Sequence, residues 1–286
     1  MQTIHGVIRA ISLSKRIFTV LVGRKIMYFY LTRSQQKKFS DYLQLGLFVS
    51  FNCSENAKIQ HNHKVYEVYN FIKLFKRAGR KTTVLFDIST VKKGVNKLIN
   101  KEQYRLFLDL EFTMPPYDYQ HGSGFVAEII QYGVYLEDPD GRLVLTRNAN
   151  VKPMNKDGLN SRTFTFLNME MKDFKNAESP YEFYRKMNDV IMMYQPVVYV
   201  WGKNDILMLN KFYEKYKLKP LVERQKIINL MQVIKNYYNI KVDIGLFNAY
   251  HLFGKAPVEE QDHNSLHDAV ATAEVFKLFQ KEISSK

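Results

Sequence analysis

The sequence is poor in cysteine and in long apolar runs. Cys53 is the single cysteine of the chain, so a disulfide framework and a cysteine-rich zinc site are both excluded. A protein with this cysteine content is expected in a reducing compartment, of which the cytoplasm is the simplest. The start of the chain has no lysine-led apolar segment with a small-residue cleavage site, and no apolar run approaches the roughly 20 residues of a membrane span. We therefore expect neither a signal peptide nor contact with a membrane.

Short apolar segments, by contrast, are plentiful. Hydrophobic residues make up 46% of the 286 residues and aromatic residues 14%, which is enough to fill a core and excludes a disordered chain. The length suits two modest domains or one large domain.

Acidic residues are scarce in one part of the chain only. Residues 1–103 contain 19 Lys and Arg but 5 Asp and Glu, whereas residues 104–286 contain 23 of each. The formal net charge of +14 at pH 7 therefore resides in the first third of the chain. An excess confined to one segment indicates a module that binds a polyanion such as nucleic acid. A basic surface that only aids solubility would explain a diffuse excess better.

Residues 1–75 are expected to form a small β-rich domain. Its five strands are expected at residues 4–11, 18–22, 25–31, 47–53 and 65–74. One helix, over residues 34–45, lies between the third and fourth strands, which is the order of an OB-fold barrel, so this domain resembles OB modules in pattern. Tyr28 and Tyr30 share one face of the third strand, where they either stack nucleic-acid bases or belong to the core.

Residues 76–103 are predicted to be a basic linker with a short amphipathic helix. The cluster Lys76, Arg77, Arg80 and Lys81 precedes apolar residues at helical spacing between Ile88 and Leu98. The lysines of that helix lie mostly off the apolar stripe. They either line a nucleic-acid path or form the solvated side of the helix.

From residue 104 onward the pattern changes to α/β. Strands are expected at residues 104–112, 127–136, 143–151, 197–200 and 227–230. Helices are expected at residues 180–194, 206–216, 233–238, 245–253 and 265–283. Ser179 caps the first of these helices, with Pro180 in its first turn.

A pair of carboxylates stands out in the first of these strands. Asp109 and Glu111 are two residues apart, so they point to one face while Leu108 and Leu110 point to the other. Two carboxylates so close together repel unless a counter-charge is present, and a divalent cation supplies one. Taken alone, the same pattern describes a strand with one wet face.

Two further candidates lie beside later elements. Asp205 follows the apolar strand 197–200 at the start of a helix, where an acidic residue is also favoured by the helix dipole alone. His263 and Asp268 open the last helix, and positions five apart on a helix diverge by about 140°. His263 must therefore precede the helix if both side chains are to approach one centre. His267 points elsewhere.

Together, these residues resemble the DEDDh exonuclease family over residues 104–286. The motifs are Asp109-x-Glu111 on an early strand, Asp205 after a middle strand, and His263-x-x-x-x-Asp268 entering the last helix. The segment from Glu128 to Gly133 and Trp201-Gly202-x-x-Asp205 are similar to the branch of sporulation-inhibitor-type, small-RNA and histone-mRNA exonucleases. The long segment 114–124 departs from the family pattern. The resemblance implies an α/β RNase H-like exonuclease domain, a mixed sheet flanked by helices, preceded by the OB-like barrel.

The chemistry of phosphodiester hydrolysis fits these residue types. Two divalent ions about 3.5–4 Å apart activate water and support the leaving oxygen. Asp109, Glu111, Asp205 and Asp268 would bind the ions, and hard oxygen ligands favour Mg²⁺ or Mn²⁺. His263 would take the proton of the attacking water. The resemblance implies the same roles, and it also implies that Thr113 and Met114 embrace the terminal nucleotide.

The sequence thus predicts a metal-dependent 3′→5′ exoribonuclease that shortens single-stranded RNA to nucleoside 5′-monophosphates. The preference for RNA rests on the branch resemblance alone. The alternatives are the same chemistry on single-stranded DNA, or a catalytically weak nucleic-acid-binding protein.

Overall fold

The computed structural model describes residues 1–119, 124–256 and 263–285. It divides into two compact units, Met1–Val95 and Asn96–Lys286. The first unit therefore extends well beyond residue 75, where the sequence had suggested that the β-rich domain ends.

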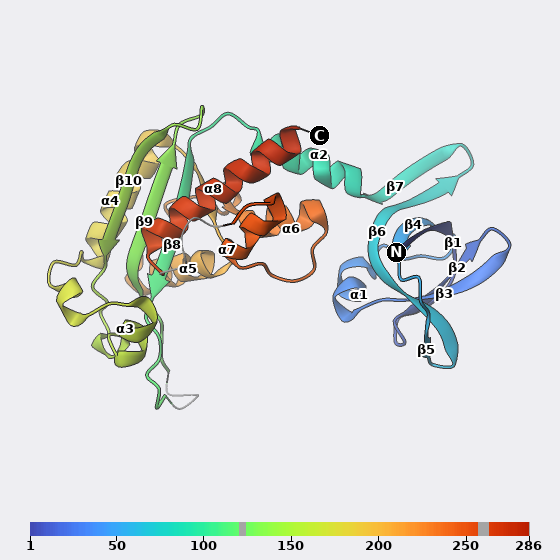
Figure 1. Ribbon diagram of the computed structural model, residues 1–286, viewed down its shortest axis with the longest axis horizontal. Coiled ribbons are helices and arrows are strands. Elements are labelled where there is room, and N and C mark those ends of the chain that lie inside the picture. The colour runs from blue at the N-terminus through green and yellow to red at the C-terminus, as the bar shows by residue number, and fades with distance from the viewer. Residues whose placement is uncertain (120–123, 257–262, 286) are drawn as a thin grey trace. The chain divides into compact units, whose positions relative to one another are not determined.

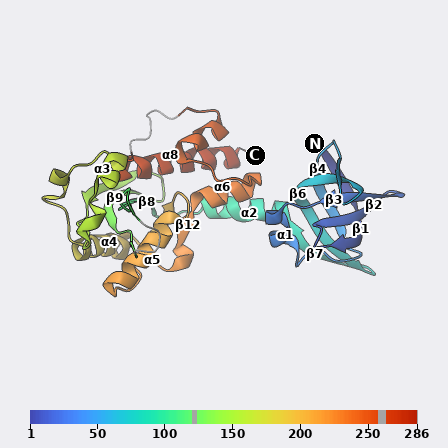
Figure 2. The same ribbon diagram turned by 90° about the horizontal axis from the view of Figure 1, so that it is seen from below.

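The first unit is built on a closed sheet, with one helix between its third and fourth strands and the start of another at its end. Its elements are β1 (Gln2–Ser12), β2 (Ile17–Val22), β3 (Lys25–Tyr30), α1 (Arg33–Phe39), β4 (Phe48–Cys53), β5 (Lys58–Gln60), β6 (His63–Ala78) and β7 (Lys81–Asp87). The strand order β3-β2-β1-β4-β6 closes on itself because β3 also pairs with β6, in parallel (Figures 1 and 2). Phe18, Phe29, Phe51 and Phe71 fill the interior, each at most 1% exposed. The five expected strands and the helix between the third and fourth are present, and the OB-like assignment itself stays a prediction.

The two tyrosines of β3 are neither core residues nor free platforms. Phe29 is fully buried, whereas Tyr28 and Tyr30 are half-buried on the opposite face. The ring of Tyr28 stacks on His63 with centroids 4.4 Å apart, and Arg16 lies over the ring of Tyr30.

The first part of the predicted linker 76–103 belongs to a β-hairpin, which corrects the boundary drawn from sequence. β6 continues to Ala78, turns, and returns as β7, with Lys76 opposite Thr83. The basic residues there concealed a strand because the hairpin has few apolar positions to alternate. Helix α2 (Ile88–Ile99) then forms where expected, with Val95 and Ile99 buried.

The second unit is built on a five-stranded mixed sheet in the order β10-β9-β8-β11-β12. The strands are β8 (Arg105–Phe112), β9 (Ile129–Glu137), β10 (Leu143–Asn150), β11 (Val197–Val200) and β12 (Ile227–Asn229). β8 runs antiparallel to β9 and parallel to β11. The ends of β8 and β11 therefore meet at one edge of the sheet.

Helices cover both faces of this sheet. They are α3 (Ser161–Leu167), α4 (Pro180–Tyr194), α5 (Asn204–Tyr216), α6 (Leu230–Tyr238), α7 (Leu246–Ala249) and α8 (Ser265–Ser284), with short 3-10 turns η1 (Lys156–Gly158), η2 (Met171–Phe174), η3 (Arg224–Lys226) and η4 (Tyr250–Phe253). Figure 2 shows the sheet between α8 on one side and α4 and α5 on the other. Leu108 belongs to the core cluster that includes α4 and α5, whereas Phe107 packs on Phe276 of α8 at 5.5 Å between centroids. The predicted mixed sheet flanked by helices is confirmed.

None of the helices in the described parts of the chain is both long enough and apolar enough to cross a membrane.

Candidate active site

Strand β8 presents its two carboxylates on the face that α8 covers. Alternation puts Leu106, Leu108 and Leu110 into the core on the other face, where all three are at most 3% exposed. Asp109 and Glu111 therefore share the opposite face, as the sequence predicted, and this is the face that α8 covers.

Asp205 is brought to the same edge by the turn after β11. Gly202 makes this turn with a φ of 90°, a conformation that residues with a Cβ rarely adopt. Its amide donates a hydrogen bond to Oδ1 of Asn229, at the start of α6. Trp201 Nε1 donates to the carbonyl of Ile244 at 2.9 Å. The Trp-Gly pair thus shapes the wall of the site and places Asp205, which is 4% exposed, in the first turn of α5.

His263 and Asp268 are fixed by the way α8 begins. His263 precedes the N-cap residue Asn264 and has a left-handed φ of 54°, so it lies on the approach to the helix as expected. The Ser265 amide and hydroxyl both donate to Oε1 of Gln131, each at 2.9 Å. A Cβ on Gly133 would lie 2.0 Å from the carbonyl oxygen of Ser265. The Gln-x-Gly sequence of β9 therefore has a physical role: it anchors the start of the helix that carries Asp268.

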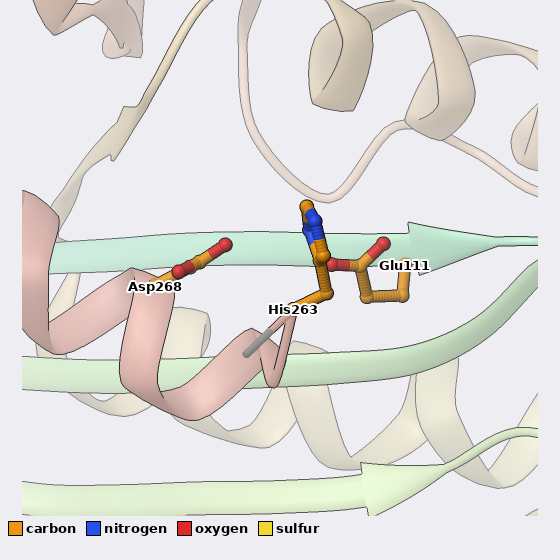
Figure 3. Close-up of side chains that lie close together, drawn as sticks. All are labelled: Glu111, His263 and Asp268. Atoms are coloured by element: carbon orange, nitrogen blue, oxygen red, sulfur yellow. The ribbon is translucent and has the colours of Figure 1, made fainter. Parts of the chain in front are cut away.

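All five predicted side chains line one cavity of about 610 Å³. Glu111, His263 and Asp268 each place a potential ligand atom within 4.8 Å of the others. Figure 3 shows the imidazole of His263 beside the carboxyl of Glu111, with Asp268 projecting from α8. Asp109 and Asp205 line the same cavity.

In the absence of a cation, burial and mutual repulsion disfavour the ionised form of these carboxylates, so their pKa values are raised. Burial, with a smaller contribution from the neighbouring carboxylates of Asp268 and Asp205, raises the pKa of Glu111 to about 8. Burial likewise raises the pKa of Asp205 to about 7, although hydrogen bonds from its own amide and that of Leu110 oppose the shift. Burial and the three neighbouring carboxylates raise the pKa of Asp109 well above its ordinary value. Among the described residues, no Lys or Arg forms an ion pair with Asp109, Glu111 or Asp205.

This donor set fits a divalent cation. It offers several carboxylate oxygens and one imidazole nitrogen and has no thiolate, a combination that suits hard cations such as Mg²⁺ or Mn²⁺. A bound cation would also supply the positive charge that the three carboxylates lack.

Of the two residues expected to contact a terminal nucleotide, one lines the cavity and the other does not. Met114 lines the cavity. Thr113 does not: it is 2% exposed, and its hydroxyl accepts a hydrogen bond from the Glu128 amide at 2.9 Å. The side chain of Thr113 is therefore engaged with the segment that leads into β9, and contact of Thr113 with a terminal nucleotide stays a prediction.

Sequence reasoning missed one aromatic side chain at the site. Phe166 of α3 lines the cavity, and its ring lies 4.4 Å from that of His263. Helix α3 was not predicted, although Asn160 accepts from the Thr163 amide as an N-cap. The asparagine three residues before Thr163 was the available signal.

The five converging side chains are those on which the resemblance to the DEDDh exonucleases rests. No protein-family model matches the chain. A curated relative, the probable 3′-5′ exonuclease KapD of Bacillus subtilis (strain 168), is 26% identical over 177 residues, which are 62% of this chain and 84% of the relative.

Solved structures agree on the fold. The nuclease domain of 3′hExo, a DEDDh family member bound to rAMP, matches with a TM-score of 0.56 and 19% identity, over 63% of this chain and 93% of that domain. A 3′-exonuclease that recognises the 3′ end of the histone mRNA stem-loop matches with a TM-score of 0.54 and 16% identity, over 63% and 83%. The predicted resemblance to the DEDDh 3′-5′ exonucleases is confirmed, and with it the prediction of an enzyme of this class.

Proposed function

We propose that this protein removes nucleotides from the 3′ end of single-stranded RNA and releases nucleoside 5′-monophosphates. The observation that carries the proposal is the convergence of Asp109, Glu111, Asp205, His263 and Asp268 on one cavity. The name of the curated relative, a probable 3′-5′ exonuclease, supports the direction of attack.

In this proposal, the chain's own residues hold the reacting groups in place. The carboxylates of Asp109, Glu111, Asp205 and Asp268 would hold two divalent cations, Mg²⁺ or Mn²⁺. When bound, these ions neutralise phosphate charge and lower the pKa of the attacking water. A ring nitrogen of His263 accepts a proton from that water as its oxygen attacks phosphorus. The bond from phosphorus to the 3′-oxygen breaks, and this oxygen takes a proton from solvent water, which leaves a shortened chain with a 3′-hydroxyl and a nucleoside 5′-monophosphate.

Met114 and Phe166 add apolar surface to the polar cavity. An apolar surface beside the carboxylates suits the flat face of a nucleobase. We infer that the terminal nucleotide lies against Met114, while its phosphate faces the carboxylates.

We favour RNA over DNA as the substrate because of a sequence resemblance and a structural neighbour. The segment from Glu128 to Gly133 and the Trp201-Gly202 pair resemble the small-RNA and histone-mRNA branch, and one structural neighbour is described with a histone mRNA stem-loop. Single-stranded DNA is the alternative substrate.

The first unit supplies the positive charge in this scheme. In our proposal this unit, Met1–Val95, is an OB-like module that binds the substrate strand electrostatically. The compartment is the cytoplasm. Cys53 fits a reducing environment because it is a free, fully buried cysteine whose thiol pKa is raised by burial.

The experiment that tests the substrate compares RNA and DNA oligomers of equal sequence, each labelled at the 5′ end. With Mg²⁺ or Mn²⁺, RNA should give a ladder that shortens from the 3′ end, and a chelator should abolish it. Faster shortening of DNA would replace the RNA proposal with its DNA alternative. Internal cleavage, or no cleavage of either, would overturn the proposed activity.

A further inference from the structure

Strands β6 and β7 form a two-stranded ribbon that extends beyond the barrel of the first unit (Figure 1). β7 pairs with β6 alone. Ala78 lies opposite Lys81, so Gly79 and Arg80 form a two-residue turn. Gly79 has a φ of 58° at the first central position, where a glycine is favoured in the turns that suit such hairpins. The ribbon is thus a well-defined hairpin with a short tip.

The outer part of this ribbon is positively charged and solvent-exposed. Lys76, Arg77, Arg80 and Lys81 are all exposed, and none forms an ion pair with a carboxylate among the described residues. The one acidic residue of the two strands beyond Glu67 is Asp87. It lies at the base of the ribbon, 3.0 Å from Lys73. The positive charge of the tip is therefore uncompensated.

The register places these cations on both faces of the ribbon. Lys76 and Lys81 share one face, because Lys81 is opposite Ala78. Arg77 points to the other face, where its guanidinium lies 5.3 Å from the ring centroid of Phe48 and 5.7 Å from that of Phe75. The two rings stack at 5.1 Å and 11°. The two aromatic rings thus hold the guanidinium of Arg77 in a defined place. A guanidinium is planar and has five N–H donors, so it suits hydrogen bonds to phosphate oxygens.

A cleft on the same barrel is much less suitable for an anion than the tip of the ribbon. It has a volume of about 300 Å³ and is lined by Tyr30, Ile59 and Glu67, among others. Its one cation, Lys58, lies 3.5 Å from a carboxylate oxygen of Glu67. The charge there is balanced, whereas that of the ribbon is not.

We propose that the tip of the β6–β7 ribbon is the surface through which the first unit binds the sugar–phosphate backbone of single-stranded nucleic acid. The identity of this polyanion rests on the proposed function. Binding through phosphates is independent of base sequence and falls with salt, because each neutralised phosphate releases counterions. For single strands the slope of log affinity against log salt is about −0.7 per phosphate contact. Four cations therefore account for a slope of up to about −3.

The test measures binding of the full chain with the site inactivated by Asp205→Asn. The probe is a labelled single-stranded RNA of about 20 nucleotides, titrated at salt concentrations from about 50 to about 200 mM. Replacing Lys76, Arg77, Arg80 and Lys81 together by Ser should weaken binding at low salt roughly tenfold or more and should flatten the salt slope by up to about 3. A second variant carries only the Lys76, Arg80 and Lys81 substitutions. It keeps Arg77, whose guanidinium packs on two rings, so that the packing is preserved, and it should still show most of the loss in affinity.

A matched control removes the same charge elsewhere on the barrel. Arg9, Lys15, Arg24 and Lys25 are also exposed, and their joint replacement by Ser should leave the slope nearly unchanged. Equal losses of affinity in the ribbon variant and in the control variant would mean that binding depends only on the total charge of the unit, which would overturn the proposal. An unchanged salt slope in the ribbon variants would overturn it as well. A duplex RNA probe that alone responds to the ribbon variants would overturn the single-strand assignment. Because this readout is binding, absence of hydrolysis by the parent protein would sink the proposed function without deciding this test.

Discussion

The Oδ1 atom of Asp205 accepts a hydrogen bond from the backbone amide of Leu110 at 3.1 Å. This contact joins the start of α5 to the strand between Asp109 and Glu111, although the two positions are 95 residues apart in sequence. It fixes one carboxylate of the site relative to two others. It also separates two roles of Asp205, hydrogen-bond acceptor and buried charge, which substitutions can probe individually.

Asp205→Asn should raise the melting temperature of the cation-free protein at pH 8 while abolishing hydrolysis. The amide oxygen of Asn still accepts from the Leu110 amide, and the substitution removes a charge that burial destabilises. The same variant should lose most of the stabilisation that Mn²⁺ gives to the parent. Thermal unfolding with chelator and with Mn²⁺ measures both effects, and a lower melting temperature for cation-free Asp205→Asn would contradict this reading.

The stability of the cation-free protein should decline as the pH rises from about 5 to about 8. Glu111 has a pKa of about 8 and Asp205 of about 7 in the folded chain, both above the value of roughly 4 for an unfolded carboxyl. The folded state therefore binds more protons than the unfolded state in this window, and stability falls with pH. Because other groups also titrate, the informative quantity is the difference in melting temperature between the parent and Glu111→Gln. This difference should favour the variant increasingly toward pH 8 and should move in favour of the parent when Mn²⁺ is added, because the variant lacks one of the carboxylates that bind the cation. A difference that does not change with pH would disprove the assignment.

Gly133→Ala should destabilise the protein and reduce turnover. Its new methyl group would lie 2.0 Å from the Ser265 carbonyl oxygen, so the start of α8 would have to shift, and Asp268 with it. We expect a loss of about 3 kcal/mol in unfolding free energy, at the upper end of what overpacking costs. Gly94→Ala is the control, because no atom lies within 4 Å of a Cβ there. Alanine is the better helix former by about 1 kcal/mol, so this control should be neutral or slightly stabilising. Equal effects of the two variants in denaturant unfolding would refute the anchoring role of β9.

His263→Ala should lower the rate of hydrolysis about 10²- to 10⁴-fold, the usual contribution of a positioned general base. Binding of RNA and cations should change little, because the four carboxylates remain. His251, an exposed histidine of η4, provides a control whose replacement by Ala should leave the rate unaltered. Single-turnover rates compare the three proteins, and a His263→Ala protein that retains the parent rate would remove the histidine from the proposed chemistry.

The sequence was most informative where a side chain's role follows from local periodicity. Alternation along β8 placed Asp109 and Glu111 on one face, and helical geometry required His263 to precede α8. Both predictions concern residues close together in sequence. That the side chains of Asp205 and of the pair on β8 line one cavity was expected from family resemblance, and the parallel pairing of β8 with β11 explains it.

What the sequence could not show depends on distant contacts or on weak local patterns. Helix α3 has seven residues and only a short apolar stripe, so Phe166 was not expected beside His263. β7 was hidden in a basic segment, and its partly buried end packs through Phe86 against Phe39, which is far away in sequence, at 5.2 Å between ring centroids. Periodicity detects faces of regular elements, and it does not detect partners.

The most direct test of the central claim is the digestion of 5′-labelled RNA by Asp109→Asn beside the parent protein in Mg²⁺ or Mn²⁺. Asp189→Asn, at an exposed position of α4, is the matched control. A bound divalent cation stabilises the charge of the transition state by several kcal/mol, and Asp109→Asn removes one of the carboxylates that would hold it. The variant should therefore be slower by at least about 10³-fold while remaining folded. The control should keep the parent rate. Digestion by Asp109→Asn as fast as that by the parent would show that the converging carboxylates are not the hydrolytic centre.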